Sequence, residues 1–178
     1  MRITAGKFKG RVLNKVPYSH IRPTADVVKQ AMFNKLAFVL PGARVLDLFC
    51  GSGALGIEAI SRGAGEVIFV DKDSRSVALT KDNLKNLGIT ASVLRAPFES
   101  ALKTLTGKFD IIILDPPYKS NDYTSALMLI EEYGLLAEDG IIVCEHDKHD
   151  KLDPLDYQVV DEKIYGLKCL TYLKKQPK

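Results

Sequence analysis

The sequence predicts an α/β fold built on a mostly parallel, doubly wound sheet of the Rossmann-like kind, and three observations lead to it. From Pro41 onward, short apolar runs alternate with stretches of helical periodicity. The runs are apolar at successive positions, which is typical of strands buried on both faces of a parallel sheet. The last two runs flank Tyr165-Gly166, which predicts an antiparallel hairpin that closes the sheet.

The elements can be placed in chain order. Thr24 is a plausible N-cap, Asp26 suits the first turn, and Val28, Met32 and Leu36 recur every four residues, so a helix is expected over 24–38. After the break at Pro41-Gly42, helices are expected over 54–62, 74–87, 98–105 and 123–136. The expected strands are residues 44–49, 66–70, 92–94, 109–114, 141–144, 157–164 and 167–173.

The N-terminal residues differ from the rest in charge. Two extended runs within 2–16 are joined by a glycine-containing turn, which predicts a β-hairpin. Residues 1–44 carry nine Lys and Arg and one acidic residue, whereas residues 45–178 carry 16 basic and 21 acidic residues. This division suggests a basic extension over residues 1–40 that meets a polyanion, attached to a body over 41–178 with a different task. The alternative is a solvated basic hairpin on an enzyme of small molecules.

Composition excludes several classes of protein. At 178 residues and 46% hydrophobic content, the chain is expected to form a compact body with a sizeable core rather than a large multidomain enzyme or a disordered protein. No apolar run reaches the length of a membrane span and no signal core follows the N-terminus, so a cytoplasmic protein without a membrane partner is expected. The three cysteines contain no C-x-x-C pair, which favours buried thiols over disulfides or a zinc site.

A glycine-rich loop follows the first strand of the sheet. Gly51, Gly53 and Gly56 fit G-x-G-x-x-G, and Asp71 ends the next strand where a ribose-binding acid is expected. This spacing fits the dinucleotide-binding fingerprint, so a nicotinamide-dependent oxidoreductase is one interpretation. Asp47, however, would place a carboxylate where a pyrophosphate should lie. A carboxylate suits a cationic ligand instead, and S-adenosylmethionine has an ammonium, a sulfonium and a ribose diol.

A second motif follows the fourth strand. The buried run 109–114 leads directly into Asp115-Pro116-Pro117-Tyr118, at the edge where open α/β sheets bind ligands. Two prolines remove backbone donors and leave a rigid turn of acceptors. Such a turn suits the exocyclic amine of a nucleobase, with the Asp115 carboxylate and the Pro116 carbonyl accepting its hydrogens and Tyr118 stacking on the base. The plainer interpretation is a proline turn that only ends a strand.

Together these motifs support a resemblance that extends over essentially the whole chain. The residues that carry it are Asp47-Leu-Phe-Cys-Gly-Ser-Gly53, Asp115-Pro-Pro-Tyr118, Arg2-Ile-Thr-Ala-Gly-Lys-Phe-Lys-Gly-Arg11, Arg22-Pro-Thr-Ala-Asp26, Met32-Phe33-Asn34, Ala54-Leu-Gly-Ile-Glu58 and Ser61-Arg-Gly-Ala64. The chain resembles the bacterial 16S ribosomal RNA guanine-N2 methyltransferase family, whose members are class I S-adenosylmethionine-dependent methyltransferases. The resemblance implies methyl transfer to the N2 of one guanine, at position 966, with S-adenosylhomocysteine as product. It also implies 16S ribosomal RNA, within a small-subunit particle or assembly intermediate, as partner. Methyl transfer needs no metal, and a lone catalytic domain is compatible with a monomer.

The resemblance also assigns roles to individual residues. Asp115, Pro116, Pro117 and Tyr118 would hold the flipped guanine, and the cofactor would lie against Thr24, Asp47, Phe49, Cys50, Gly51, Ser52, Gly53, Asp71, Lys72, Ala96 and Pro97. One departure is that many members carry an Asp for the adenine amine where this chain has Arg95-Ala96-Pro97-Phe98, so a backbone carbonyl or Glu99 would replace it. Contacts to RNA phosphates would come from Arg2, Lys7, Lys9, Arg11 and Arg22.

Other interpretations stay open at this point. Adenine-N6 methylation of nucleic acid also fits Asp115-Pro-Pro-Tyr118, and a noncatalytic RNA-binding assembly factor would need neither motif. Cys50 lies on the cofactor side and not the target side, which argues against a nucleophilic role. His146 and His149 lie in a charged segment, where a solvated turn is expected rather than a metal site.

Overall fold

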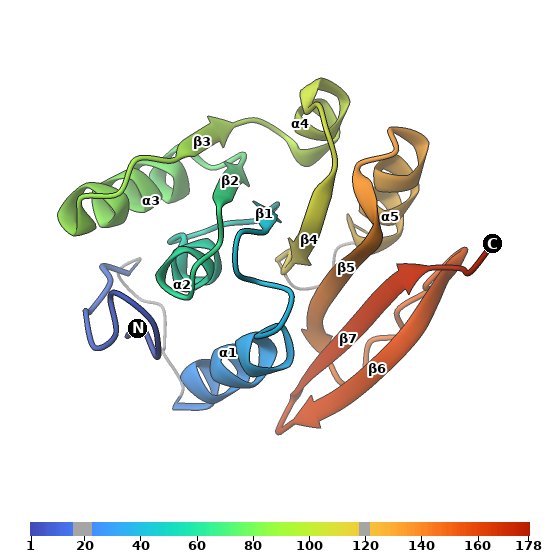
Figure 1. Ribbon diagram of the computed structural model, residues 1–178, viewed down its shortest axis with the longest axis horizontal. Helices are drawn as coiled ribbons and strands as arrows, with labels where there is room; N and C mark the ends of the chain where they lie inside the picture. Colours follow the sequence, from blue (N-terminus) through green and yellow to red (C-terminus); the bar gives the residue numbers. More distant parts are fainter. Residues whose placement is uncertain (16–22, 118–121) are drawn as a thin grey trace.

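The structure, a computed structural model, describes residues 1–15, 23–117 and 122–178, and only the backbone of residues 23 and 24. It contains the expected seven-stranded sheet with helices on both faces (Figure 1). The helices are α1 (Pro23–Lys35), α2 (Ala54–Ser61), α3 (Ser74–Leu87), α4 (Phe98–Thr104) and α5 (Asp122–Glu132). The strands are β1 (Arg44–Asp47), β2 (Glu66–Asp71), β3 (Ser92–Arg95), β4 (Phe109–Leu114), β5 (Leu136–Asp147), β6 (Tyr157–Tyr165) and β7 (Lys168–Lys175).

The sheet confirms the predicted fold class. Its strand order is β3-β2-β1-β4-β5-β7-β6, in which the first five strands are parallel and the β6–β7 hairpin joins antiparallel to β5. The chain runs outward from β1 to β3 and then crosses back to β4 on the other side of β1. The order therefore reverses between β1 and β4, and open α/β sheets bind ligands beyond the carboxyl ends of the strands at such a point.

Two hydrophobic layers enclose the sheet. Helices α1, α2 and α3 cover one face and α4 and α5 cover the other (Figure 1). Neighbouring residues of one strand enter opposite layers: Val45 packs with the α1–α3 layer and Leu46 with the α4–α5 layer. This two-sided burial explains why the strands are apolar at successive positions.

The largest difference from the expected elements lies between α5 and β5. The helix was expected to run to residue 136 but ends at Glu132, because Gly134 takes a left-handed backbone conformation with φ +61°. Leu136 already pairs with Phe109 of β4, and the register then shifts so that Ile111 pairs with Ile141. The expected strand over 141–144 is thus the middle of a longer, irregular strand that continues to Asp147.

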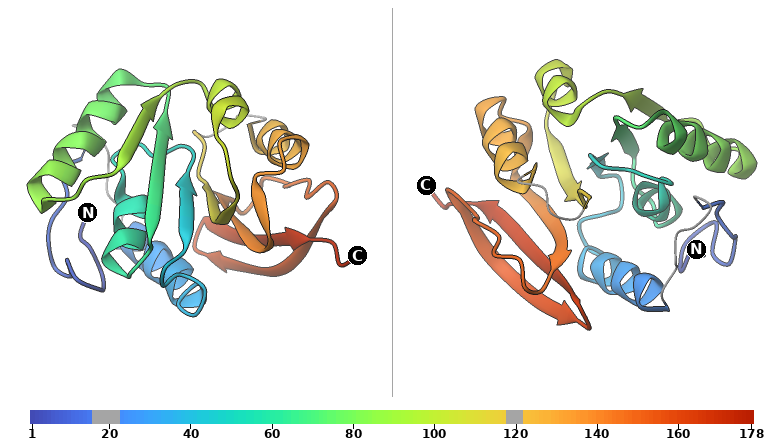
Figure 2. Two further views of the ribbon diagram at one scale, coloured as in Figure 1. Left: turned by 45° about the horizontal axis from the view of Figure 1, so that its top comes forward. Right: turned by 180° about the vertical axis from the view of Figure 1, so that it is seen from behind.

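The N-terminal segment is a reduced form of the expected hairpin. Among the described residues of this segment, one antiparallel bridge joins Arg2 to Val12, and a turn connects them. Ile3 and Leu13 are buried in the same core as α1 and α2, and the segment lies beside α2 and α3 (Figure 2). The basic segment is therefore packed against the sheet domain. Among the described residues, no helix is long and apolar enough to cross a lipid bilayer.

Candidate active site

The glycine loop connects β1 to α2 at the switch point of the sheet. Gly51 and Gly53 have φ values of +54° and +79°, which favour glycine strongly over other residues. No heavy atom lies within 4 Å of the position that a Cβ on Gly51 would occupy, so the loop has open space there. Gly56 serves packing instead, because a Cβ there would lie 2.2 Å from the Phe69 ring on β2. The loop thus combines an open backbone surface with a tightly packed helix behind it.

Asp47, the last residue of β1, lies beneath this loop. Its side chain is 1% exposed, and its Oδ2 accepts a hydrogen bond from the Gly56 N–H at 2.9 Å. Burial raises the pKa of Asp47 to about 7, and the nearby Asp71 adds to the rise while the Gly56 hydrogen bond opposes it. A cation in the open space near the loop would favour the ionised form of this carboxylate.

Asp71, at the end of β2, is bonded to the loop directly. Its Oδ2 accepts from the Gly51 N–H and its Oδ1 from the Asp73 N–H, both at 2.9 Å. The Ala96 N–H, after β3, donates to the Asp71 backbone oxygen at 3.1 Å. The structure therefore brings the glycine loop, Asp71 and Ala96 to one edge of the sheet, as the sequence predicted.

Helix α3 supports the loop through two residues that the sequence analysis missed. The Thr80 hydroxyl donates to the Gly51 carbonyl and the Asn83 amide donates to the Ser52 carbonyl, each at 2.9 Å. Both side chains are buried. Polar residues on a helix usually indicate a solvent-facing side, so periodicity gave no signal for them.

Two aromatic side chains, Phe49 of the glycine loop and Phe98 of α4, pack against each other. The rings of Phe49 and Phe98 lie 5.3 Å apart and are tilted by 55°. Pro97 and Glu99 are exposed beside them at the start of α4, and Lys72 is exposed after β2. Phe98 begins α4 directly after Ala96 and Pro97, so the aromatic pair lies next in the chain to the residues expected to contact the adenine.

The acceptor turn follows β4, on the other side of the switch point. β4 pairs directly with β1, so the turn begins next to the strand that carries Asp47. Asp115 is partly buried, Pro116 is buried and Pro117 is exposed. Desolvation raises the pKa of Asp115 well above its usual value, the Glu145 carboxylate adds to the rise, and Lys168 opposes it. Tyr118, Arg22 and the Thr24 side chain lie outside the described residues.

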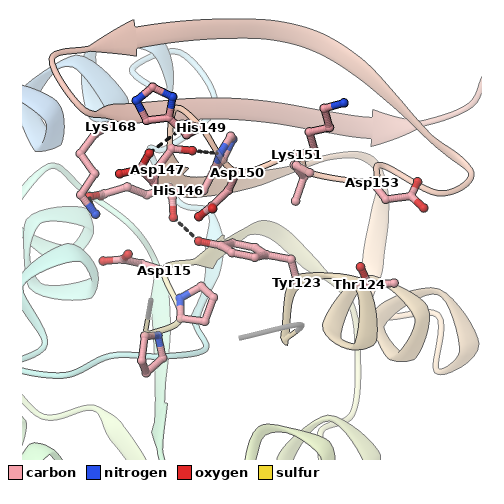
Figure 3. Close-up of a pocket in the computed structure, with 14 residues that line it drawn as sticks. Asp115, Tyr123, Thr124, His146, Asp147, His149, Asp150, Lys151, Asp153 and Lys168 are labelled. Atoms are coloured by element: carbon pink, nitrogen blue, oxygen red, sulfur yellow. Dashed lines mark hydrogen bonds and ion pairs between the residues drawn. The ribbon is translucent and has the colours of Figure 1, made fainter. Parts of the chain in front are cut away.

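A cavity of about 300 Å³ opens beside Asp115 (Figure 3). It is lined by the acceptor turn, the start of α5, the carboxyl end of β5 with the following loop, and Lys168 of β7. The Tyr123 hydroxyl donates to the Glu145 backbone carbonyl, and Lys168 Nζ lies 3.4 Å from Glu145 Oε1. Tyr123, Glu145 and Lys168 were missed from the sequence because they converge only when β5, β7 and α5 pack together.

The two histidines differ in their environments. His149 is exposed, as expected of a solvated turn, but that expectation is wrong for His146, which is 5% exposed. Its Nε2 lies 2.8 Å from Thr171 Oγ1, because β5 extends through residue 147 and pairs with β7. The ligand atoms of His146, Glu162 and Cys169 lie within 4.8 Å of one another. The Thr171 hydroxyl also donates to Glu162, so hydrogen bonds link His146, Thr171 and Glu162.

The cysteines match their expected character. Cys50, Cys144 and Cys169 are free and buried. Burial raises the pKa of the Cys50 thiol, with the Asp47 charge adding to the effect. A thiol with a raised pKa is a poor nucleophile, in agreement with the interpretation of Cys50 as a packing residue.

The basic residues of the N-terminal segment fall into two groups. Lys7 and Lys9 are exposed in the turn. The guanidinium groups of Arg2 and Arg11 are also exposed but donate to backbone carbonyls, to Gly10 at 2.7 Å and to Asn86 of α3 at 3.1 Å. Arg11 therefore attaches the segment to α3 and Arg2 stabilises its turn, while both keep their charges at the surface.

Comparison with known proteins agrees with this arrangement. A family model described as conserved hypothetical protein 95 matches residues 1–174. The chain belongs to this family. YlbH of Bacillus subtilis, provisionally named an rRNA methyltransferase, is 45% identical over 99% of this chain and 100% of its own length. Ribosomal RNA small subunit methyltransferase D of Escherichia coli is 33% identical over 93% of this chain and 85% of its own.

The fold is also similar to that of a solved structure described as a methyltransferase. An Escherichia coli protein provisionally described as a methyltransferase superposes with a TM-score of 0.86 at 31% identity, and 99% of each chain is covered. The resemblance drawn from the motifs and the predicted fold class are both confirmed.

Proposed function

We propose that this protein transfers a methyl group from S-adenosylmethionine to the exocyclic N2 of a guanine in 16S ribosomal RNA, at position 966. The observation that carries the proposal is the pairing of two motifs across the switch point. The open glycine loop follows β1, and the acceptor turn of Asp115 and Pro116 follows the adjacent strand β4. The names of the related proteins support ribosomal RNA as the substrate class.

The residues present fit S-adenosylmethionine. The open surface at Gly51 allows a ligand to approach the backbone, and the buried Asp47 carboxylate favours a cationic one. Asp71 ends β2 at the position suited to ribose hydroxyls, and Phe49 with Ala96 and Pro97 would enclose the adenine. When bound, the cofactor supplies an electrophilic methyl group.

The chain's own contribution to the reaction is to position the amine. The nitrogen of an exocyclic amine is a poor nucleophile because its lone pair is delocalised into the ring. The Asp115 carboxylate and the Pro116 carbonyl would accept its two hydrogens, which favours a pyramidal nitrogen with an available lone pair. Positioning and charge stabilisation of this kind supply the rate without a covalent enzyme intermediate.

The N-terminal segment would contact RNA phosphates. Lys7 and Lys9 are exposed, and Arg2 and Arg11 keep their charges at the same surface. We propose that residues 1–40 serve as the RNA-binding extension of the domain formed by 41–178. The substrate would be RNA in a small-subunit particle or assembly intermediate, and the protein would act as a monomer without a metal.

The test is methyl transfer from labelled S-adenosylmethionine to small-subunit RNA, free and in particles, followed by nucleoside mass spectrometry. We expect N2-methylguanosine at position 966. Asp115→Ala should reduce transfer to near background while the affinity for S-adenosylhomocysteine changes little. The proposal is wrong if the label is found on adenine N6, if the Asp115→Ala variant stays active, or if the protein binds a nicotinamide dinucleotide instead of S-adenosylhomocysteine.

A further inference from the structure

The cavity beside Asp115 has a second set of polar groups behind the acceptor turn. Leu114 of β4 pairs with Cys144 of β5, so the residues that follow them, Asp115 and Glu145, emerge side by side from adjacent strands. Lys168, at the start of β7, has its Nζ 3.4 Å from Glu145 Oε1. Figure 3 shows its ammonium on the same side of the cavity as the Asp115 carboxylate.

Asp115, Glu145 and Lys168 line one cavity, so a base held there by Asp115 would have the other two side chains nearby. The side chains of Glu145 and Lys168 are 14% and 23% exposed, so both are largely shielded from water yet reach the cavity. Hydrogen bonds to charged groups in such surroundings discriminate well between ligands, because a wrong ligand leaves a desolvated charge without a partner. The site thus offers two carboxylate acceptors and one ammonium donor.

Guanine matches this set and adenine does not. Along its Watson–Crick edge guanine presents the N2 amine and the N1–H as donors, followed by the O6 acceptor. Adenine presents one amine donor and a bare N1, which would face a carboxylate as acceptor against acceptor. The order of groups therefore distinguishes the two bases, whereas the acceptor turn alone suits either exocyclic amine.

We propose that Glu145 accepts the N1–H of the target guanine and that Lys168 donates to its O6, so that this pair determines the choice of base. The inference rests on the proposed guanine-N2 function and explains its specificity. Neither residue contacts the methylated nitrogen in this arrangement, so their effect is on recognition. Tyr123 supports them, because its hydroxyl bonds the Glu145 backbone carbonyl.

The test uses base analogues at the methylated position, introduced by ligation of synthetic RNA. 2-Aminopurine keeps the N2 amine but lacks the N1–H and the O6. We expect the unaltered protein to prefer guanine over 2-aminopurine in kcat/KM by at least about tenfold. Glu145→Gln replaces the carboxylate by a neutral amide, which accepts the guanine N1–H more weakly and can donate to the bare N1 of 2-aminopurine. It should lower kcat/KM for guanine, raise it for 2-aminopurine, and shift their ratio by at least about tenfold. Lys168→Met should lower the guanine reaction and spare the 2-aminopurine reaction.

Matched controls exist on the same two strands. Glu138 of β5 and Lys175 of β7 form an ion pair of 3.8 Å away from the cavity, and Glu138→Gln and Lys175→Met should leave the ratio unchanged. A purely structural role of Glu145 would lower both reactions equally, and an unchanged ratio in Glu145→Gln would overturn the inference. If instead the unaltered protein methylates no guanine at N2, the proposed function itself fails, so the two failures are distinguishable.

Discussion

The backbone N–H of Gly51 donates to Oδ2 of Asp71 at 2.9 Å, and the other oxygen of that carboxylate accepts from the Asp73 N–H. The end of β2 is therefore tied to the glycine loop that follows β1. Asp71 was expected as a ribose ligand, and this bond gives it a structural role as well. Loss of the carboxylate should affect the shape of the loop together with any contact to a ligand.

Asp71→Asn tests this connection. Asparagine keeps one acceptor oxygen and places an NH2 group against a backbone N–H, so one hydrogen bond is lost and a donor faces a donor. We expect the free energy of unfolding to fall by about 1–3 kcal/mol. The dissociation constant for S-adenosylhomocysteine, measured by calorimetry, should rise at least about tenfold, which corresponds to about 1.4 kcal/mol.

The matched control is Asp73→Ala. Asp73 is the N-cap of α3 and accepts from the N–H groups of Arg75 and Ser76. Its removal should cost about 1 kcal/mol of stability with no change in ligand affinity. Equal effects of the two variants on affinity would contradict the loop-anchoring role of Asp71.

Asp47 should make cofactor binding depend on pH. Its carboxyl is buried near Asp71, Asp115 and Cys50, and its folded-state pKa is about 7 against 3.8 in the unfolded chain. Its contribution to stability is therefore present below about pH 4 and is lost as pH rises to about 7. A cationic cofactor favours the ionised form, so affinity for S-adenosylmethionine should increase as pH rises to about 7 and then level off.

Calorimetry at pH 6 and pH 8 in buffers of different ionisation enthalpy provides the measurement. We expect proton release on binding at pH 6 and little at pH 8. Asp47→Asn cannot ionise, so it should show weaker binding with no such proton release. Proton release that persists in Asp47→Asn would assign the titration to another group.

Most of the fold could be predicted from local sequence patterns, because cap residues and apolar strands mark where most elements begin and end. The helix over 74–87 was predicted with the observed bounds, because Asp73 and Gly88 are strong cap residues and the strand before it, β2, is apolar on both faces. The predicted helix end at residue 136 was wrong because Leu135 and Leu136 continue a helical apolar pattern. Their burial in the sheet core, together with the left-handed Gly134, ends the helix earlier than periodicity indicates.

Some residues of the candidate site could be predicted from local sequence patterns, and others depend on the pairing of distant strands. Gly51, Asp71 and Asp115 were predictable because each lies at or just beyond the carboxyl end of a buried strand, and carboxyl ends of parallel strands share one edge. Glu145 and Lys168 were not, because their contact depends on the antiparallel pairing of β5 with β7. His146 was misread as solvated because the charged residues around it obscured the continuation of β5 through residue 147.

Docking of the N-terminal segment should depend on Gly6 and not on Gly10. Both glycines have positive φ, +82° and +86°, but a Cβ on Gly6 would lie 1.8 Å from the Ser61 backbone oxygen while a Cβ on Gly10 would meet no atom within 4 Å. Gly10→Ala should therefore cost only backbone strain, about 1 kcal/mol. Gly6→Ala should also break the contact in which the Lys7 N–H donates to the Ser61 carbonyl at 2.7 Å.

Hydrogen exchange of the Lys7 and Phe8 amides measures this docking directly, since both donate to Ser61. Exchange should accelerate strongly in Gly6→Ala and little in Gly10→Ala. RNA affinity should also fall more in Gly6→Ala, because an undocked segment must be ordered again on binding. Equal protection in the two variants would show that the close approach to Ser61 does not hold the segment.

Glu58 should make the same docking sensitive to acid. Its side chain is fully buried on α2, where it accepts from the Thr4 N–H at 3.0 Å and from Arg62 Nε at 2.9 Å, and lies 3.3 Å from Lys29 Nζ. Burial alone would raise the pKa of Glu58, but these hydrogen bonds and charges hold it below its usual value.

The stabilising contribution of Glu58 is therefore complete above about pH 4.5 and is lost as pH falls through the lowered pKa. Glu58→Gln removes the buried carboxylate beside Lys29, whose ammonium keeps Asp26 at 3.6 Å as an acidic partner, and should lower the free energy of unfolding by about 3 kcal/mol at pH 7. Glu66→Gln, which removes an exposed carboxylate paired with Arg44, should change it by at most about 1 kcal/mol. Urea unfolding from pH 3 to pH 7 compares the two, and similar losses for both variants would remove Glu58 as the anchor between the N-terminal segment and α2.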